Sequence, residues 1–196
     1  MKNKSFQLLI FLLFFNSNIS GQVYTNLEIF KILSDSISNK IIQNLTYQNS
    51  NIQLEFLGYH QLNILSDFIR VNLIKRGNKL SSENSFNEKV SLIITEASVL
   101  YEDLFKEHIF DKFQMIRNIR LSGNLIISNS NKIVDFNYTH IDTIDFDNYK
   151  ILENKLYPFT VGLPPKEPFF LTIIEPVVAI VASATAIILF FTIRSK

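Results

Sequence analysis

The spacing of apolar side chains predicts a helix at the start of the middle part of this chain. Between residues 26 and 46 apolar side chains recur at steps of three and four, which is typical of a helix with one buried face. They are Leu27, Phe30, Leu33, Ile37, Ile41 and Leu45. Thr25 and Glu28 stand three residues apart at its start, as in a capping box that satisfies free amides of a first turn. We therefore expect a capped helix here.

Two further elements are expected before residue 80. Apolar and polar residues alternate over residues 52–56, as in a half-buried strand. Helical spacing returns over residues 62–73, and Gly77 stands where a left-handed residue would end that helix. The first half of the chain is therefore predicted to be helix, strand, helix.

The period of the pattern changes to two after a polar break at residues 81–88. Residues 90–101, 116–128 and 132–143 are rich in β-branched and aromatic residues and alternate between apolar and polar positions. Residues 102–113 are mixed in character, and we expect them to connect the first two strands as a short helix or a packed loop. The second half is therefore predicted to be an antiparallel meander of three strands.

This order of elements predicts an α+β fold, with two helices packed on one face of a mainly antiparallel sheet of four or five strands. Residues 22–156 have the length of one domain. The stretch Leu33–Leu80 and the hairpin Ile119–Phe136 resemble, in the order of their elements, the small extracytoplasmic α/β modules of the TolB amino-terminal domain and of curli-secretion proteins. The resemblance implies an assembly or binding role in an envelope complex, and it carries over no catalytic residue.

The N-terminal end of the chain has the pattern of a secretory signal peptide. Residues 1–4 form a short basic segment, residues 5–15 are apolar, and small polar residues follow. The apolar run is too short to span a bilayer as a helix. Residues 1–21 are therefore predicted to be a signal peptide, and the domain after them to be exported.

The C-terminal end predicts a membrane anchor. Residues 157–168 contain four of the five prolines and are expected to form a linker. Residues 169–193 are long enough to form a single transmembrane helix. The basic residues within 194–196 would be retained in the cytoplasm. The predicted topology is that of a single-pass membrane protein whose domain lies outside.

Cysteine content decides the expected compartment. The chain has no cysteine, which excludes disulfides, thiolate metal sites and cysteine nucleophiles. A domain without disulfides fits a bacterial periplasm better than a heavily bridged extracellular setting. We therefore expect the bacterial inner membrane, with the domain in the periplasm, and keep a eukaryotic secretory pathway as the alternative.

Composition also argues against several activities. The chain carries 19 Lys and Arg against 18 Asp and Glu, a balance that gives no electrostatic footprint for nucleic acid. With five glycines and no Gly-rich loop it lacks a phosphate cradle, and no serine stands in a nucleophile-elbow context. We expect no cofactor, no metal and no catalytic residue.

Four polar residues on two adjacent predicted strands are the candidate ligand-binding residues. Arg117 and Arg120 fall on opposite faces of one strand, where either could meet a carboxylate or a partner. His140 and Asp142 share a face of the next strand. Acid-base work or metal binding at His140 would need convergent groups that the sequence does not show. Ordinary strand polarity is the alternative interpretation of these residues.

Glu175 interrupts the predicted transmembrane helix near its outer end. A carboxylate costs about 2.5–3.5 kcal/mol at the centre of a bilayer and much less near its interface. Glu175 is compatible with a plain anchor, with pairing to a partner helix, or with a tail that a processing enzyme recognises. Ala179 and Ser183 stand four residues apart, which permits close helix contact and a homodimer through this segment.

The sequence therefore predicts a noncatalytic, membrane-tethered extracytoplasmic domain that binds other envelope proteins or takes part in envelope assembly. The alternative is an envelope enzyme or a small-ligand-binding protein with its site near His140 and Asp142. A deep cleft with convergent polar groups would favour the alternative, and an open sheet edge would favour protein binding.

Overall fold

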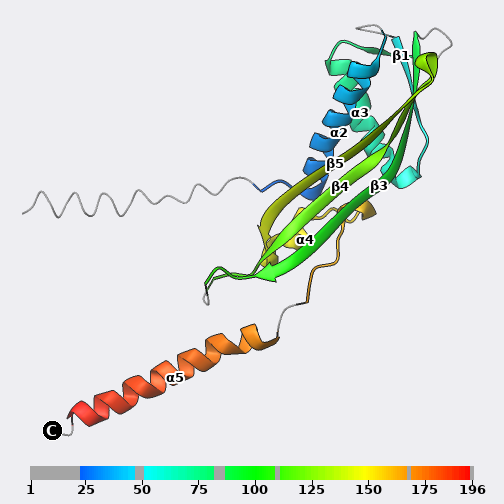
Figure 1. The fold of residues 1–196 in the computed structure, drawn as a ribbon. Helices are drawn as coiled ribbons and strands as arrows, with labels where there is room; N and C mark the ends of the chain where they lie inside the picture. The colour runs from blue at the N-terminus through cyan, green and yellow to red at the C-terminus, as the bar shows by residue number, and fades with distance from the viewer. Residues whose placement is uncertain (1–22, 47–50, 82–86, 109–110, 167–168, 195–196) are drawn as a thin grey trace, which may run out of the picture.

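The computed structural model describes residues 23–46, 51–81, 87–108, 111–166 and 169–194. Figure 1 shows an elongated body of helices and a twisted sheet, followed by a C-terminal helix. The helices are α2 (Asn26–Asn44), α3 (Asn63–Lys75), α4 (Tyr149–Leu152) and α5 (Phe169–Arg194). The strands are β1 (Asn51–Phe56), β2 (Lys79–Leu80), β3 (Glu88–Phe105), β4 (Gln114–Ile127) and β5 (Lys132–Asp145). Short 3-10 helices lie at His60–Leu62, Ser128–Ser130, Phe146–Asn148 and Pro158–Thr160.

The predicted α+β fold is confirmed, and the sheet has five strands of mixed direction. The strand order is β2-β1-β3-β4-β5. The sequence predicts a mainly antiparallel sheet; β3, β4 and β5 do form an antiparallel meander, but β1 pairs in parallel with both β2 and β3. The parallel pairs arise because α3 carries the chain back along the sheet after β1, so that the next strands run in the same direction as β1.

α2 begins at the capping box that the sequence predicts. The Glu28 amide donates to Thr25 Oγ1 at 3.3 Å, and the Thr25 amide donates to the Glu28 carboxylate at 2.8 Å. The bond from the Thr25 amide is the main reason that the pKa of Glu28 lies below its usual value. The local sequence therefore fixes where this helix starts.

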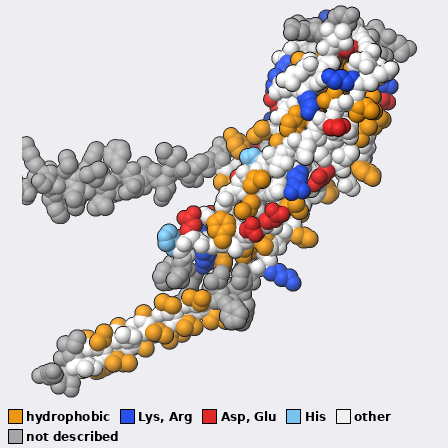
Figure 2. All heavy atoms as spheres, in the orientation of Figure 1, with side chains coloured by type: hydrophobic (Ala, Val, Ile, Leu, Met, Phe, Trp, Pro, Cys, Tyr) orange, Lys and Arg blue, Asp and Glu red, His pale blue; other side chains and the backbone are white. Residues whose placement is uncertain are grey.

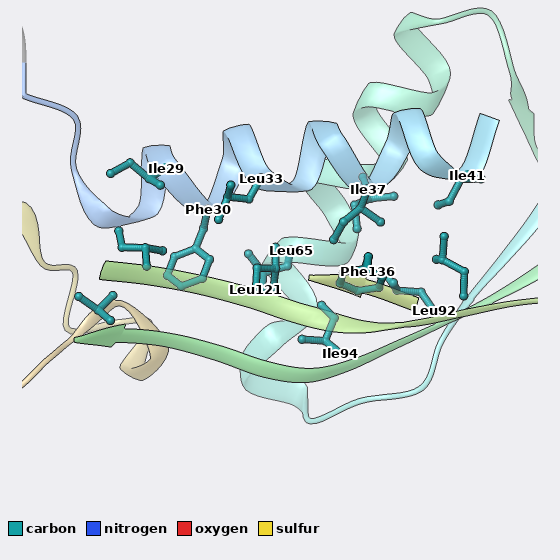
Figure 3. Packing of buried hydrophobic residues seen from close by; sticks show 14 of the residues in the cluster. Ile29, Phe30, Leu33, Ile37, Ile41, Leu65, Leu92, Ile94, Leu121 and Phe136 are labelled. Carbon is teal, nitrogen blue, oxygen red and sulfur yellow. The ribbon is translucent and has the colours of Figure 1, made fainter. Parts of the chain in front are cut away.

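The core lies between the two long helices of the body and one face of the sheet. Figure 3 shows Phe30 and Ile37 of α2 pointing toward Leu121 of β4 and Phe136 of β5, with Leu65 of α3 beside them. All five side chains are buried. The predicted arrangement, with both helices on one face of the sheet, is thus confirmed.

β4 alternates between a covered and an open face, as its sequence predicts. Its buried residues on the helix-covered face are Met115, Arg117, Ile119, Leu121, Gly123, Leu125 and Ile127. The residues between them are half-buried, apart from Asn118. The alternation places Arg117 on the core side of the strand and Arg120 on the open side, which confirms their predicted separation.

β3 is longer than the sequence predicts. The pattern predicts a connector over residues 102–113, but the strand continues to Phe105. Its register against β4 shifts between Ile94 and Glu96 and again between Glu102 and Phe105. A β-bulge absorbs an extra residue without ending a strand, and such irregularities let β3 continue through a charged stretch.

α3 ends at Lys75, and Gly77 follows as the left-handed residue that stops it, as predicted. Gly77 has a φ of 88°, in the left-handed region. Its amide donates to the Ile74 carbonyl at 3.0 Å, and the Asn78 amide donates to the Leu73 carbonyl at 3.1 Å. These are the two bonds of a Schellman motif, and they turn the chain directly into β2.

The first residues of the predicted linker, residues 157–168, pack against the body. Pro158–Thr160 form a 3-10 helix, and the Thr160 side chain is fully buried. The Phe159 ring meets the Phe30 ring edge-on, with centroids 4.9 Å apart. The first residues of this stretch therefore belong to the body.

α5 lies beyond the body in Figure 1, and hydrophobic side chains cover the part of it that Figure 2 describes. Within the residues that the structure describes, no helix combines the length and the apolar character needed to cross a membrane. The predicted transmembrane helix at residues 169–193 is therefore not confirmed and stays a prediction. The predicted signal peptide, residues 1–21, lies outside the described residues.

Candidate functional site

Arg117 is fully buried on the helix-covered face of β4. Its Nε and Nη2 donate to the two oxygens of Asp142 at 2.8 and 2.5 Å, which makes a bidentate ion pair with the residue directly opposite on β5. Its Nη1 donates to the Tyr24 carbonyl and to Asn26 Oδ1, both at 2.8 Å. The guanidinium is therefore bonded through each of its three nitrogens to groups of the protein itself.

Asn26 extends these contacts toward the C-terminal side of the body. Its Nδ2 donates to the Tyr101 hydroxyl at 2.9 Å and to the Thr160 carbonyl at 2.8 Å. We call Arg117, Asp142, Asn26, Tyr101 and Thr160 the Arg117 network. It joins the start of α2, all three long strands and the segment that leads to α5.

Two members of the network have shifted pKa values. Burial alone would raise the pKa of Asp142, but the hydrogen bonds and charge of Arg117 outweigh burial and hold that pKa below its usual value. Burial raises the pKa of Tyr101 to about 12. Asp142 is therefore an anion whose counter-ion is an internal side chain, and the Tyr101 hydroxyl stays protonated at neutral pH.

His140 lies at the margin of this network, and Arg120 lies apart from it. His140 Nε2 is 3.4 Å from the Asp142 carboxylate, and 38% of the His140 side chain is exposed. The predicted pairing of these two residues on one strand face is confirmed. Arg120 lies on the other face of the sheet, opposite Ser98 of β3 and Thr139 of β5. The structure thus brings three of the four predicted residues together, and a ligand-binding role for them stays a prediction.

Asn26 and Tyr101 are not among the site residues predicted from the sequence. Asn26 is 91 positions from Arg117 in the chain, and as the residue after a capping threonine it resembles an ordinary start of a helix. Tyr101 follows the alternation of β3 like its apolar neighbours. No local pattern distinguishes these residues, because the network forms only once α2 is packed on the sheet.

A second polar cluster lies between β3 and β4. Ligand atoms of Glu107, His108 and Asp111 lie within 4.8 Å of one another, and His108 Nδ1 is 2.7 Å from the Asp111 carboxylate. All three side chains are exposed. Exposed acidic groups often gather in this way without binding a metal.

Two open hollows lie on the surface of the described residues. One, of about 440 Å³, is lined by Tyr24, Glu28, Lys31, Ile32, Asp35 and Asn72. The other, of about 370 Å³, lies at β1 and the end of β2. Neither hollow includes any of the four predicted ligand-binding residues.

β5 forms one edge of the sheet along its whole length. Its 14 residues pair with β4 in one register, from Lys132 to Asp145, without a bulge. No strand among the described residues pairs with its other side. Because backbone groups point alternately to the two sides of a strand, every second N–H and C=O of β5 points away from the sheet.

Apolar side chains are exposed next to this edge, on the face of the sheet that the helices leave open. Ile133 and Ile141 of β5 are 66% and 63% exposed, and Leu100 of β3 is 40% exposed. Asn118 of β4 lies opposite both Leu100 and Ile141. It is buried, and its Oδ1 has no hydrogen-bond partner within the described part of the chain.

The residues predicted to mediate contact between membrane helices lie in α5. The Ser183 hydroxyl donates to the Ala179 carbonyl at 2.7 Å within the helix, and both residues are exposed. The side chain of Glu175 lies outside the described residues. A helix contact through these three positions stays a prediction.

Comparison with known proteins identifies no family. No family model matches the chain, and no curated protein matches it. A solved structure described as a minor lipoprotein from Acinetobacter baumannii aligns with 15% identity over 50% of this chain and 68% of that chain, with a TM-score of 0.35. A similarity at this score assigns neither a fold family nor a function.

Proposed function

We propose that this protein is a noncatalytic protein-interaction domain, exported and tethered to a membrane by its C-terminal segment, with a role in envelope assembly. The observation that carries the proposal is the unpartnered edge of β5 within the described structure. A free edge binds a partner strand through main-chain hydrogen bonds, while side chains at alternate positions give specificity.

The composition of β5 supports this role. Strands that remain at the edge of a soluble sheet are commonly blunted by a proline, by a bulge or by lysines along the strand. β5 has no proline and no bulge, and its one lysine, Lys132, is its first residue. The exposed Ile133 and Ile141 add apolar surface that a partner strand would cover.

The Arg117 network supports a structural role for the polar residues that the sequence singled out. An external carboxylate at Arg117 would have to displace Asp142, Asn26 or the Tyr24 carbonyl from a fully buried guanidinium. Removing one partner of such a buried pair is strongly destabilising. The network is better suited to holding β5 firmly in the sheet, where its edge is presented on a rigid scaffold.

The tether and the location in this proposal rest on the sequence. The signal-peptide pattern at residues 1–21 sends the domain to the periplasm, and the apolar segment 169–193 crosses the inner membrane of a bacterium once. Residues 194–196 then lie in the cytoplasm.

Protease added to the outer face of spheroplasts tests the tether. We expect digestion of the region between residues 23 and 166 and recovery of a small C-terminal fragment in the membrane. Protection of the whole region would contradict the topology, and so would release of the intact protein by an alkaline carbonate wash.

A charge placed at the edge tests the interaction surface. The full chain extracted in a mild detergent is compared with Ile141→Lys and with Ile74→Lys, a matched control because Ile74 is a 56% exposed isoleucine on α3. We expect the original chain and Ile74→Lys to sediment as the same complex and Ile141→Lys to sediment as a smaller species. Equal masses for all three proteins would contradict a role for the β5 edge.

A further inference from the structure

We infer that the strand which binds the β5 edge is the β5 edge of a second copy of this chain, paired antiparallel about a two-fold axis at Asn137. The inference rests on the proposed function, in which this edge binds a protein strand, and it names that strand.

The geometry of a two-fold axis fixes which residues meet. Two copies of one surface patch pair isologously about such an axis, and two identical strand edges then run antiparallel. With the axis at Asn137, each residue faces the residue equally far on the other side of position 137 in the second copy. Paired residues then share the same face of the sheet, so that the inner and outer faces of the two copies are continuous.

The outer face is self-complementary in this register. Ile133 faces Ile141 of the second copy, and the same pair forms again on the other side of the axis. Both isoleucines are largely exposed in the single chain, and the pairing covers both. Asp135 faces Thr139. Asn137 faces itself on the axis, where an amide side chain can both donate and accept a hydrogen bond.

The inner face is complementary in the same register. Lys132 faces Asp142, so that opposite charges stand directly across the seam. Phe136 faces Tyr138, and these two rings already stack along β5 with centroids 6.2 Å apart. No pair of like charges stands opposite between residues 132 and 142.

Neighbouring registers lose these matches. An axis at Tyr138 places Ile141 opposite Asp135, and an axis at Phe136 places Ile141 opposite Asn131. An axis at Asp135 brings two carboxylates together, which is unfavourable across strands. The axis at Asn137 is therefore the register that pairs both isoleucines.

The helices on the inner face leave room for this pairing. α2 lies along β5, since the Tyr138 hydroxyl donates to the Ser36 carbonyl at 3.2 Å and Lys132 Nζ donates to Asn44 Oδ1 at 2.7 Å. It also packs on β4. Because α2 lies over both β4 and β5, its axis is about one strand spacing, roughly 4.8 Å, from the seam. Two α2 helices would therefore lie about 10 Å apart across the seam, near the usual distance of packed helices.

Disulfide cross-linking of the full chain in membranes tests the register. The chain contains no cysteine, so every disulfide that this protein forms must involve the introduced cysteine. Residues directly opposite in an antiparallel pair have Cα atoms about 4.5–5.5 Å apart, within the range of about 4.4–6.8 Å that a disulfide bridges. Asn137→Cys should therefore form dimers under mild oxidation, and its position is exposed, so the fold tolerates the change.

Ile133→Cys and Ile141→Cys supply the matched control. Alone, either variant should form at least tenfold less dimer than Asn137→Cys. The introduced cysteine and its copy in the second chain then lie eight residues apart along the seam, roughly 27 Å. When the two variants are co-expressed with different tags, the mixed dimer should form as readily as with Asn137→Cys. Equal cross-linking by all single variants, or no dimer from Asn137→Cys, would overturn the inference.

The result also separates the inference from the proposed function. If the Asn137→Cys variant links to a different protein, the second copy is excluded while the edge still binds a protein strand. If that variant links to nothing and Ile141→Lys leaves the native mass unchanged, both the inference and the proposed function fail. A dimer formed only through α5 would leave the introduced thiol unlinked and counts against the inference.

Discussion

The two edges of the sheet differ in length, in side chains and in how they are held. β2 pairs only Lys79 and Leu80 with β1, and the exposed Lys79 stands in that short edge. β5 pairs along 14 residues and carries exposed isoleucines. Short strands and lysines prevent pairing with other chains. The β2 edge is therefore closed to other chains by its short strand and its lysine, and the β5 edge is left open.

The open edge is also the better anchored one. Phe136 of β5 is buried beneath α2, and Asp142 holds the buried Arg117. β2 is held by the turn at Gly77 and by two residue pairs with β1. A strand whose side chains belong to the core keeps its unpaired N–H and C=O groups in fixed positions. β5 is therefore a stable template for a partner strand, whereas β2 is not.

Truncating one core side chain at each edge should give the largest contrast. Phe136→Ala should lower the free energy of unfolding by about 3–5 kcal/mol, because Phe136 is only 2% exposed. Leu80→Ala should cost about 1 kcal/mol, since Leu80 is half-buried at a short strand. Denaturant unfolding of both variants measures the difference, and equal losses would show that β5 is no better anchored than β2.

Removing the carboxylate that fastens β5 should have the next largest effect. Asp142→Asn should cost about 1.5–3 kcal/mol, the range for hydrogen bonds to a charged group, because it leaves the buried Arg117 without its counter-ion. Asp35→Asn is the control: Asp35 pairs with Arg76 at 2.9 Å, but both side chains are about 40% exposed, and such pairs contribute about 0–1 kcal/mol. Similar losses in the two variants would mean that the Arg117 network does not fasten β5.

Acid should weaken the same attachment. A carboxyl whose pKa is lowered by folding stabilises the protein fully above its unfolded pKa, about 3.9 for aspartate, and this stabilisation is lost as the pH falls below that value. The pKa of Asp142 is lowered in the folded protein, because the bonds to Arg117 outweigh burial. Thermal unfolding between pH 6 and pH 3 should therefore show a smaller loss of stability for Asp142→Asn than for the original chain. Parallel pH curves would contradict this role.

A modest effect is also expected at the turn before β2. Gly77→Ala should cost about 1–2 kcal/mol, because an alanine is strained at a φ of 88°. Gly77→Asn should cost less, since asparagine tolerates the left-handed region. Equal stability of both variants and the original chain would show that the turn before β2 does not hold this edge.

The local pattern of the sequence predicted where most helices and strands lie. The direction and the length of strands depend on pairing between residues far apart in the chain, and these were not predicted. The capping box at Thr25, the left-handed Gly77 after α3 and the two faces of β4 were predicted because each depends on neighbouring residues. The direction of β1 was not, because six alternating residues look the same whether they pair in parallel or antiparallel. The length of β3 was missed because its register shifts interrupt the alternation.

The candidate site divides in the same way. Alternation predicted that Arg117 and Arg120 lie on opposite faces and that His140 and Asp142 share a face. It gave no partner for the Arg117 guanidinium. Asn26 and Tyr101 reach Arg117 only through the packing of α2 on the sheet. The open edge of β5 could not be predicted either, because the sequence shows that a strand exists but not whether another strand lies beside it.

Amide hydrogen exchange in β5 reports on the backbone groups of the edge themselves. In the full chain at a concentration where it associates, the amides between Lys132 and Asp142 that point away from β4 should exchange as slowly as those that point toward it. In Ile141→Lys the outward amides should become fast, while the inward amides and those of α2 stay slow. Fast exchange of the outward amides in the original chain would show that no strand pairs with this edge.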